Sequence, residues 1–287
     1  MMRITRALGM LHCIPARWYL TVAYWLETGR WIDWDKPETF SDKLQWLKLY
    51  GGTQRYAHLV DKAAVRDWVA QLIGREYLVP SLGAYDRPEQ IPWHALPDRC
   101  VIKCTHGSHC GIVLDGKAPP DRQAVIRKLR KWQRRNWYWF GREPAYRDLA
   151  PRILIERYLG GDDPPDDYKI MCFSGRAEVV QLHRKSGRET RIDFFDRNGV
   201  RIDMRKPGYR RSQRLEIPHC DLAKLLPVAE RIASAIDVPY VRVDLYLVRG
   251  QVYFGEVTFF DSAGFRPFEP EAAEAWLGSL IDIRRGS

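Results

Sequence analysis

The sequence predicts an α+β protein in which antiparallel strands are combined with helices. Two segments near the C-terminus, 241–248 and 252–259, are rich in β-branched and aromatic residues and flank a short loop, which is typical of a hairpin. Apolar residues at three- and four-residue spacing between 222 and 236 predict a helix just before it. With 287 residues, 45% hydrophobic and 29% charged, the chain can form one large domain or two lobes with their own cores.

The other elements follow from the same signals along the chain. Residues 1–60 are mostly helical in pattern, and their last helix ends at Gly51 and Gly52. Further helices are expected over 61–73, over the basic segment 121–136 and after Pro270. The remaining expected strands are 100–104, 112–114, 153–158, 168–173, 177–183, 191–195 and 200–203.

The register of the C-terminal hairpin follows from its two faces. A three-residue loop would pair Val248 with Val252, and Asp244 would then face Glu256. A two-residue loop would put Asp244 opposite Gly255 and would mix polar with apolar residues on both faces. The three-residue loop is therefore favoured.

In this register Arg242 faces Thr258, beside the acid pair Asp244 and Glu256. The other face is wholly apolar and consists of Val241, Val243, Leu245, Leu247, Tyr253, Gly255, Val257 and Phe259. Two carboxylates with β-carbons about 5 Å apart repel each other unless a cation lies between them. Mg²⁺ suits the pair because it takes one or two carboxylates and leaves positions for water and phosphate oxygens. The alternative is a surface acid pair with a neighbouring arginine salt bridge.

Net charge and cysteine spacing indicate which kinds of partner the protein binds and in which cellular compartment we expect it. The formal net charge of +10 attracts polyanions such as nucleotides, anionic polysaccharide, nucleic acid or an anionic membrane surface. The six cysteines follow no secreted spacing pattern, and Pro15 and Arg17 interrupt the early apolar stretch, so we expect a cytoplasmic protein without a signal peptide. Residues 3–34 mix arginine with aromatic residues, and either pack on their own domain or rest on a membrane as an amphipathic helix.

A loop between two expected strands has features of a phosphate-binding segment. Lys103 precedes residues 106–110, a loop that contains glycine. Backbone N–H groups of such a loop approach phosphate closely, and the lysine supplies a point charge. The cysteines and histidines here also allow a zinc interpretation, but their spacing matches no familiar finger, and alternation directs Cys100 and Cys104 toward a core.

Two further segments allow two interpretations each. Strand 153–158 leads into an acidic loop, which is either a linker that offers polar groups to a nucleotide or a solvated surface loop. Segment 127–140 interleaves basic and aromatic residues, as in some nucleic-acid-binding proteins. A helix that buries Leu129 and Trp132 and keeps its charges in water is the commoner explanation.

Taken in order, several of these segments resemble the ATP-grasp superfamily, and most of all its branch related to TupA of teichuronopeptide biosynthesis, which makes a cell-surface polysaccharide. The resemblance runs from about residue 39 to residue 283. It is carried by segments 38–50, 61–66, 103–108, 141–143, 151–152 and the hairpin that continues into 260–265.

The resemblance implies an ATP-grasp fold, in which two α+β lobes with antiparallel sheets enclose a nucleotide cleft, plus a short N-terminal helical segment. The implied boundaries are 1–58 for this segment, 59–155 for the lobe with the phosphate-covering loop and 156–287 for the lobe with the hinge and the metal-binding hairpin. ATP and Mg²⁺ are the implied cofactors.

The resemblance also implies roles for single residues. The implied nucleotide-binding residues are Lys62, Lys103 and Lys169 at the phosphates, Gly107 and Ser108 in the covering loop, Glu156, Arg157, Tyr158 and Leu159 in the adenine hinge, and Asp167 at the ribose. Asp244, Glu256 and Thr258 would bind the metal, although the family commonly has Asn where this chain has Thr258. Arg242 and Lys103 would act in catalysis. The candidate substrate contacts are Ser262, Gly264, Arg266 and the segment from His183 to Arg191, with Arg191 foremost.

The implied activity is an ATP-dependent ligase that joins a carboxylate to an amine through an acyl phosphate. The expected partners are an anionic glycan or another carboxylate substrate and an amine co-substrate, with no nucleic acid. The glycan would be a surface polysaccharide or its precursor, which leaves peripheral membrane contact through the N-terminal segment open. Two alternatives also remain open: a phosphotransferase that acts on a hydroxyl, and a non-catalytic polyanion-binding protein, whose binding would be salt-sensitive.

Overall fold

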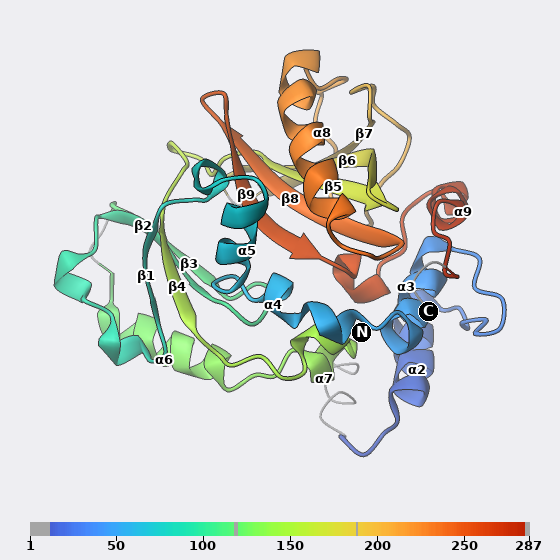
Figure 1. The fold of residues 1–287 in the computed structure, drawn as a ribbon, viewed down its shortest axis with the longest axis horizontal. Coiled ribbons are helices and arrows are strands. Elements are labelled where there is room, and N and C mark those ends of the chain that lie inside the picture. The colour runs from blue at the N-terminus through green and yellow to red at the C-terminus, as the bar shows by residue number, and fades with distance from the viewer. Residues whose placement is uncertain (1–11, 118–119, 188, 285–287) are drawn as a thin grey trace.

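The structure is a computed structural model that describes residues 12–117, 120–187 and 189–284 (Figure 1). It confirms the α+β class, with one antiparallel sheet in the order β1-β4-β2-β3 and a second in the order β7-β6-β5-β8-β9. The part of the expected segment 3–34 that precedes residue 12 lies outside the described residues. Within the described residues, no helix is long and apolar enough to cross a membrane.

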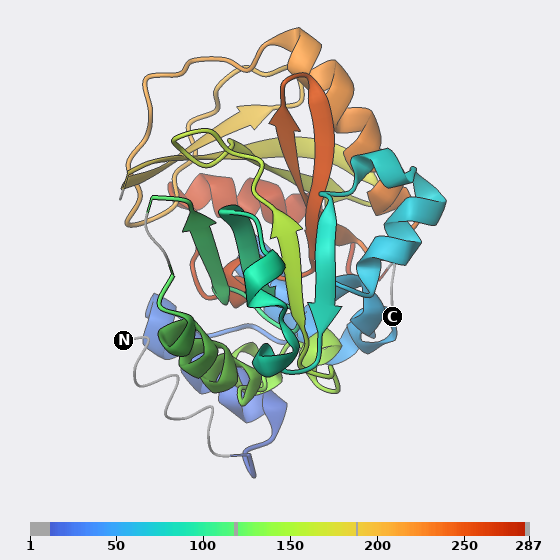
Figure 2. The same cartoon turned by 90° about the vertical axis from the view of Figure 1, so that its left-hand side faces the viewer.

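The smaller sheet packs against a helix that lies at its lower end in Figure 2. Its strands are β1 (Ser81–Tyr85), β2 (Arg99–Cys104), β3 (Gly111–Asp115) and β4 (Ile153–Arg157). Helix α6 (Arg122–Gln133) buries Leu129 and Trp132 in the same core as Cys100 and Cys104, as alternation along β2 predicted. Lys103 consequently points away from that core. The predicted boundary between residues 155 and 156 falls inside β4.

The larger sheet packs its back face on helix α8 (His219–Ser234), which buries Leu222, Leu225 and Ile232. Its strands are β5 (Asp167–Phe173), β6 (Arg176–Ser186), β7 (Glu189–Asp196), β8 (Tyr240–Val248) and β9 (Gln251–Thr258). Charged side chains occupy the opposite face of β5, β8 and β9, which leaves that face available for a polar site.

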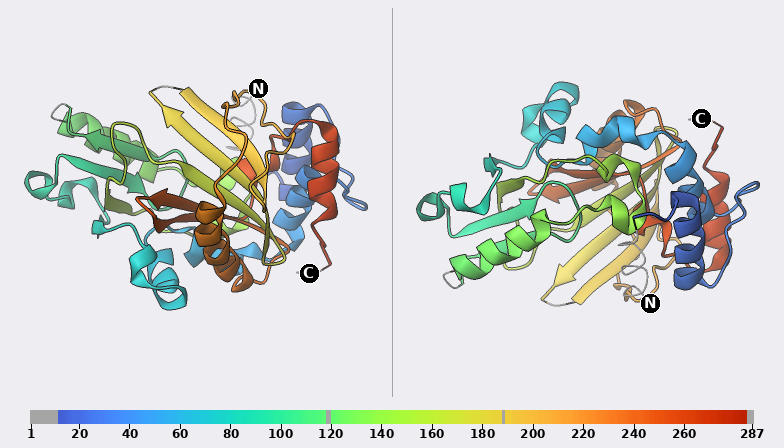
Figure 3. Two further views of the ribbon diagram at one scale, coloured as in Figure 1. Left: turned by 90° about the horizontal axis from the view of Figure 1, so that it is seen from above. Right: turned by 90° about the horizontal axis from the view of Figure 1, so that it is seen from below.

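The other helices lie around the two sheets, as the two views in Figure 3 show. They are α2 (Ala16–Thr28), α3 (Phe40–Tyr50), α4 (Ala57–Val60), α5 (Val65–Leu72), α7 (Tyr138–Gly141) and α9 (Glu271–Ser279). Phe40, Leu44 and Leu47 of α3 belong to the core of the larger sheet. The N-terminal helices are therefore integrated with the rest of the protein.

Two expected elements differ from the structure, and one strand of the structure was not expected. Residues 200–203 form only isolated bridges at Val200 and Arg201 instead of a strand. The helix expected from residue 61 begins at Val65, because the Asp61 carboxylate accepts hydrogen bonds from the N–H groups of Ala63 and Ala64 and holds a turn there. Strand β1 was not predicted, since Gly83 interrupts its pattern at a register shift.

The hairpin loop is also shorter than predicted. Val248 pairs with Gln251, so the turn has two residues, Arg249 and Gly250, with φ of 52° and 81°. A register shift then leaves Gly255 as an extra residue.

This β-bulge restores the predicted pairs, Asp244 opposite Glu256 and Arg242 opposite Thr258. Tyr253 pairs with Tyr246 on the polar face, whereas the prediction placed it on the apolar one. The predicted pairs of Arg242 and Asp244 are confirmed, whereas the predicted loop and the pair of Val248 with Val252 beside it were wrong.

Candidate active site

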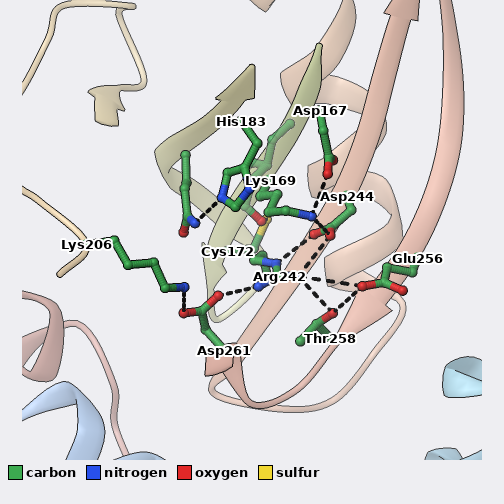
Figure 4. Close-up of polar contacts among 12 residues, drawn as sticks. Asp167, Lys169, Cys172, His183, Lys206, Arg242, Asp244, Glu256, Thr258 and Asp261 are labelled. Carbon is green, nitrogen blue, oxygen red and sulfur yellow. Dashed lines mark hydrogen bonds and ion pairs between the residues drawn. The ribbon is translucent and has the colours of Figure 1, made fainter. Parts of the chain in front are cut away.

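The centre of the polar face is a buried arginine that holds two carboxylates (Figure 4). Arg242 Nε and Nη2 donate to the two oxygens of Asp244 at 2.7 and 2.8 Å. Its Nη1 donates to Asp261, and Nη2 also reaches Thr258 Oγ1 at 3.2 Å. Asp244 is 2% exposed and Arg242 is 7% exposed, so the pair is held in a fixed geometry away from bulk water.

Strand β5 adds a second cation to this face. The Lys169 ammonium donates to Asp244 and forms an ion pair with Asp167 Oδ2 at 2.8 Å. Burial alone would lower the pKa of Lys169, but Asp167 and Asp244 outweigh it, so the pKa is raised and the lysine stays charged. Asp167 Oδ1 is buried and has no hydrogen-bond partner among the described residues.

Glu256 on β9 faces a third cation. Its Oε2 lies 3.0 Å from Lys62 Nζ, and its Oε1 lies 3.6 Å from Arg242 Nη2 and 3.4 Å from Thr258 Oγ1. Burial would raise the pKa of Glu256, but Lys62, Lys169 and Arg242 overcome that effect and lower it. The carboxylate therefore remains ionised.

Lys62 connects this face with the loop after β2. Its Nζ donates to Gly107 O at 2.9 Å, and its N–H donates to Thr105 O at 3.1 Å. The preceding residue, Asp61, accepts a hydrogen bond of 2.9 Å from Thr105 Oγ1. The turn at Asp61 and the loop are thus fixed to each other.

The loop itself packs closely on an indole ring. A β-carbon added to Gly107 would lie 1.9 Å from Trp137 Nε1, so only glycine fits there. The next residue, Ser108, hydrogen-bonds to Tyr146. The backbone of Gly107 and Ser108 can therefore lie close to the polar face that carries the acid pair.

Lys103 and Glu156 form an ion pair in the smaller sheet. Lys103 Nζ lies 2.5 Å from Glu156 Oε2, and Arg66 Nη1 lies 2.7 Å from Glu156 Oε1. The other expected hinge residues continue from β4: Arg157 is exposed, and Tyr158 and Leu159 are half-buried. The side chain of Glu156 binds within the protein, so the hinge could offer a nucleotide only backbone groups at this residue.

The candidate substrate contacts divide into two places. Ser262 and Gly264 lie in a left-handed turn after Asp261, where Gln45 Nε2 donates to Gly264 O at 2.7 Å. Arg266 follows this turn and is exposed. Arg191 on β7, by contrast, lies opposite Arg184 in the register of β6 and β7. Because side chains alternate along β6, both arginines lie on the face of the sheet opposite to His183 and the acid pair. Arg191 lines a separate pocket of about 570 Å³.

Lys206 and Gln181 of this face were missed by the sequence reasoning, whereas His183 begins the segment that was expected to contact the substrate. Lys206 Nζ donates to Asp261 Oδ2 at 2.6 Å, and both side chains are buried. His183 hydrogen-bonds to Gln181 on the same face of β6. Burial, together with the charges of Lys169 and Lys206, lowers the pKa of His183 to about 2. Asp261 lies in a segment that carried the resemblance, whereas nothing in the local pattern identified Lys206.

The segment after α7 supplies a further buried carboxyl group, that of Glu143. Burial raises the pKa of Glu143 to about 7, and Lys48 opposes this shift without reversing it. Lys48 Nζ donates to Ala263 O at 2.6 Å and so supports the left-handed turn. The turn is held by polar contacts from α3.

The donor set of the acid pair fits Mg²⁺. Asp244, Glu256 and Thr258 offer hard oxygen atoms on neighbouring strands, which is the ligand type that this ion prefers. Lys62, Lys169 and Arg242 balance the charge of these carboxylates. Among the described residues no group of three or more His, Cys, Asp or Glu side chains could hold a metal, so a metal here would need phosphate or water as further ligands.

Solved structures to which this structure is similar include three ligases. The ligase PsnB complexed with a minimal precursor has a TM-score of 0.41 and 16% identity, over 76% of this chain and 59% of that chain. D-alanine–D-alanine ligase from Bacillus anthracis has a TM-score of 0.48 and 15% identity, over 79% of this chain and 68% of that chain. L-amino acid ligase from Bacillus licheniformis has a TM-score of 0.46 and 13% identity, over 87% of this chain and 56% of that chain. This chain thus spans 56–68% of the length of these three proteins.

The sequence comparisons identify the family. No curated protein sequence matches the chain. The family model described as TupA-like ATPgrasp matches residues 42–282, which is most of the 287 residues. The protein therefore belongs to the TupA-like ATP-grasp family.

Proposed function

We propose that the protein is an ADP-forming ligase that uses ATP to join a carboxylate to an amine. The observation that carries the proposal is the convergence of Lys62, Lys169 and Arg242 on the acid pair Asp244 and Glu256. Three fixed cations around two carboxylates match the needs of a triphosphate that is bound with a divalent ion. Membership of the family supports the same conclusion.

ATP would lie between the two sheets. Lys62 and Lys169 would exchange their carboxylate partners for phosphate oxygens, and Lys103 would approach from the smaller sheet. The loop with Gly107 and Ser108 would cover the phosphates. Asp167 Oδ1, which lacks a partner among the described residues, is suited to accept a hydrogen bond from a ribose hydroxyl. Backbone groups of residues 156–159 would contact the adenine.

Asp244, Glu256 and Thr258 would hold Mg²⁺, with the Thr258 hydroxyl in place of the amide that the family commonly uses. The ion, when bound, neutralises phosphate charge and orients the γ-phosphoryl group. Arg242 is fixed by Asp244 and Asp261, so it would present a preorganised guanidinium to charge that develops during the transfer.

The reaction has two balanced steps. A carboxylate oxygen of the substrate attacks the γ-phosphorus of ATP. The bond between this phosphorus and the oxygen that bridges it to the β-phosphorus breaks, ADP leaves, and the substrate becomes an acyl phosphate. The amine nitrogen then attacks the acyl carbon, phosphate leaves, and the amine loses a proton. Closure of the two lobes would exclude water that would otherwise hydrolyse the acyl phosphate.

We further propose that the carboxylate belongs to a surface polysaccharide or its precursor, such as a uronic-acid residue. The net charge of +10 favours an anionic substrate. The turn that contains Ser262 and Gly264 follows the hairpin directly and adjoins Arg242 through Asp261, so it is the natural contact for the substrate carboxylate. Asp261 and Lys206 would hold this turn in place.

The first experiment is calorimetric titration with a non-hydrolysable ATP analogue, with and without Mg²⁺. We expect Mg²⁺ to strengthen binding in the wild type and to have no such effect in Glu256→Gln. Glu256 is preferable to Asp244 as the variant, because Asp244→Asn would leave the buried Arg242 and Lys169 without their main partner. Absence of nucleotide binding under every condition would exclude the proposed site.

Product analysis then separates a ligase from a phosphotransferase. Acid–amine pairs are screened for release of ADP and free phosphate, and uronic acids are tested first. A ligase yields ADP, phosphate and an amide, whereas a phosphotransferase yields ADP and a phosphorylated acceptor without free phosphate. A phosphorylated hydroxyl as the only product would overturn the ligase assignment and leave the ATP site intact.

A further inference from the structure

One end of the molecule carries an exposed aromatic face that the proposed reaction does not use. Trp18, Val22 and Trp25 are spaced so that they share one side of α2, and all three are exposed. Trp25 stacks on Trp31 with ring centroids 5.4 Å apart. Trp18 is 69% exposed and Trp31 is 63% exposed. Exposed indoles gathered on one face mark an interaction surface, unlike single exposed apolar residues.

The opposite side of α2 is fully used by the fold. Tyr19, Leu20 and Tyr24 are buried in a cluster that Leu49 of α3 and Phe265 complete. Tyr19 also donates a hydrogen bond of 2.7 Å to Phe140 O, which fixes α2 to α7. The exposed face therefore points away from α3 on a helix that is firmly attached.

Helix α6 presents a basic face at the same end. Val125, Leu129 and Trp132 point inward. The exposed cations of this segment are Arg122, Arg127, Lys128, Arg130, Lys131, Arg134 and Arg135. Residues 122–142 contain no Asp or Glu. Within the described residues, Arg130 alone of these seven forms an ion pair, with Glu89 at 2.8 Å.

Helices α2 and α6 lie at the same end of the molecule. Figures 1 and 2 both place them at the lower end, and the view from below in Figure 3 shows both, with α7 between them. This end therefore carries the exposed indoles of α2 and the exposed cations of α6.

We propose that this end binds the surface of an anionic lipid bilayer. Indole rings of α2 would enter the interface between headgroups and acyl chains, where tryptophan is enriched, and the cations of α6 would lie against anionic headgroups. Residues 12–36 carry three cations and three acids, so the attraction comes from α6 and the insertion from α2. Pairing with a second copy would bring two α6 faces of equal charge together.

The test is vesicle flotation with the full chain. Vesicles of phosphatidylcholine alone are compared with vesicles in which about one third of the lipid is phosphatidylglycerol. We expect binding to the anionic vesicles only, and we expect it to weaken as salt is added, because screening reduces attraction between charges. No binding to anionic vesicles at low salt would overturn the proposal.

Paired variants assign the binding to the two helices. Arg127→Glu with Lys131→Glu should lower partitioning about tenfold or more. Lys224→Glu with Arg231→Glu makes the same charge change on α8, at the other end of the molecule in Figure 1, and should have a much smaller effect. Equal losses in the two charge variants would contradict the assignment to α6.

Trp18→Ser with Trp31→Ser tests the aromatic face, and Leu215→Ser, at a side chain that is 71% exposed and four residues before α8, is its control. Binding that persists unchanged in the tryptophan variant would remove α2 from the interface. A dimer that only the tryptophan variant dissociates, together with absence of vesicle binding, would show instead that the surface joins two copies. Titration with the ATP analogue verifies folding of every variant, and its outcome is independent of the membrane result.

Discussion

Lys62 Nζ lies 3.0 Å from Glu256 Oε2 and 2.9 Å from Gly107 O, so one side chain connects the hairpin that carries the acid pair with the loop after β2. Lys62 belongs to a turn and Glu256 to an edge strand, and 194 positions of sequence separate them. Under the proposed function, ATP that enters between the two segments would take over Lys62 from Glu256 and free the carboxylate for the metal.

Lys62→Met should therefore weaken ATP-analogue binding about 10- to 100-fold, which corresponds to the loss of one charge-assisted contact. The measurement is calorimetry in the presence of Mg²⁺. Lys36→Met, at an exposed lysine that pairs only with Glu38 among the described residues, is the matched control and should bind as the wild type does. Equal affinities of wild type and Lys62→Met would remove this lysine from the phosphate site.

Gly107→Ala should destabilise the loop, because a β-carbon at this position would lie 1.9 Å from Trp137 Nε1. We expect a loss of about 1–3 kcal/mol in the free energy of unfolding, together with weaker ATP-analogue binding. The variant Trp137→Ser removes the obstructing ring, so the alanine should cost less in that background. A double-mutant cycle in urea measures the coupling, and additive effects would show that the ring does not require glycine.

The hairpin illustrates how far the sequence predicts the site. Alternation placed Asp244 opposite Glu256 and Arg242 opposite Thr258, because only that arrangement separates polar from apolar side chains. The same argument predicted the wrong loop length, because it assumed regular antiparallel pairing and side-chain alternation does not reveal the β-bulge at Gly255. Burial patterns therefore predict which residues face one another better than they predict local backbone irregularities.

Long-range polar contacts were beyond the reach of pattern reasoning. Lys206 donates a hydrogen bond to Asp261, which lies 55 residues later in the sequence. The segment that contains Lys206 forms no helix or strand. His183 occupies an ordinary strand position, and its surroundings are created by Lys169 from β5 and Arg242 from β8. Such contacts depend on the final arrangement of strands, which no local spacing encodes.

The two-residue turn predicts a stabilising substitution. Arg249 has a φ of 52°, a conformation that costs most residues energy and that asparagine tolerates well. Arg249→Asn followed by Gly250 gives the favoured sequence for a type I′ turn and should raise the free energy of unfolding by about 0.5–1 kcal/mol. Urea denaturation at constant m-value measures the gain. Arg176→Asn, at an exposed strand position with negative φ, should give no gain, and equal gains in both variants would contradict the turn assignment.

His183 predicts how stability changes with pH. Burial, Lys169, Lys206 and Arg242 together lower its pKa from 6.5 to about 2, and Asp261 opposes them only in part. Below pH 6.5 the unfolded chain binds a proton at this position that the folded protein does not bind. The free energy of unfolding therefore falls as pH decreases from 6.5, with a limiting slope of about 1.4 kcal/mol per pH unit from this group.

The matched variant is His183→Asn, which keeps a polar partner for Gln181 and does not titrate. Urea denaturation at several pH values between 6.5 and 4 should give a shallower slope for the variant than for the wild type, because its folded and unfolded states bind the same number of protons at this position. The two curves should converge as pH decreases, since the wild type alone loses this contribution. Parallel curves would mean that His183 accepts a proton in the folded protein, and that the cations around it do not exclude a further positive charge.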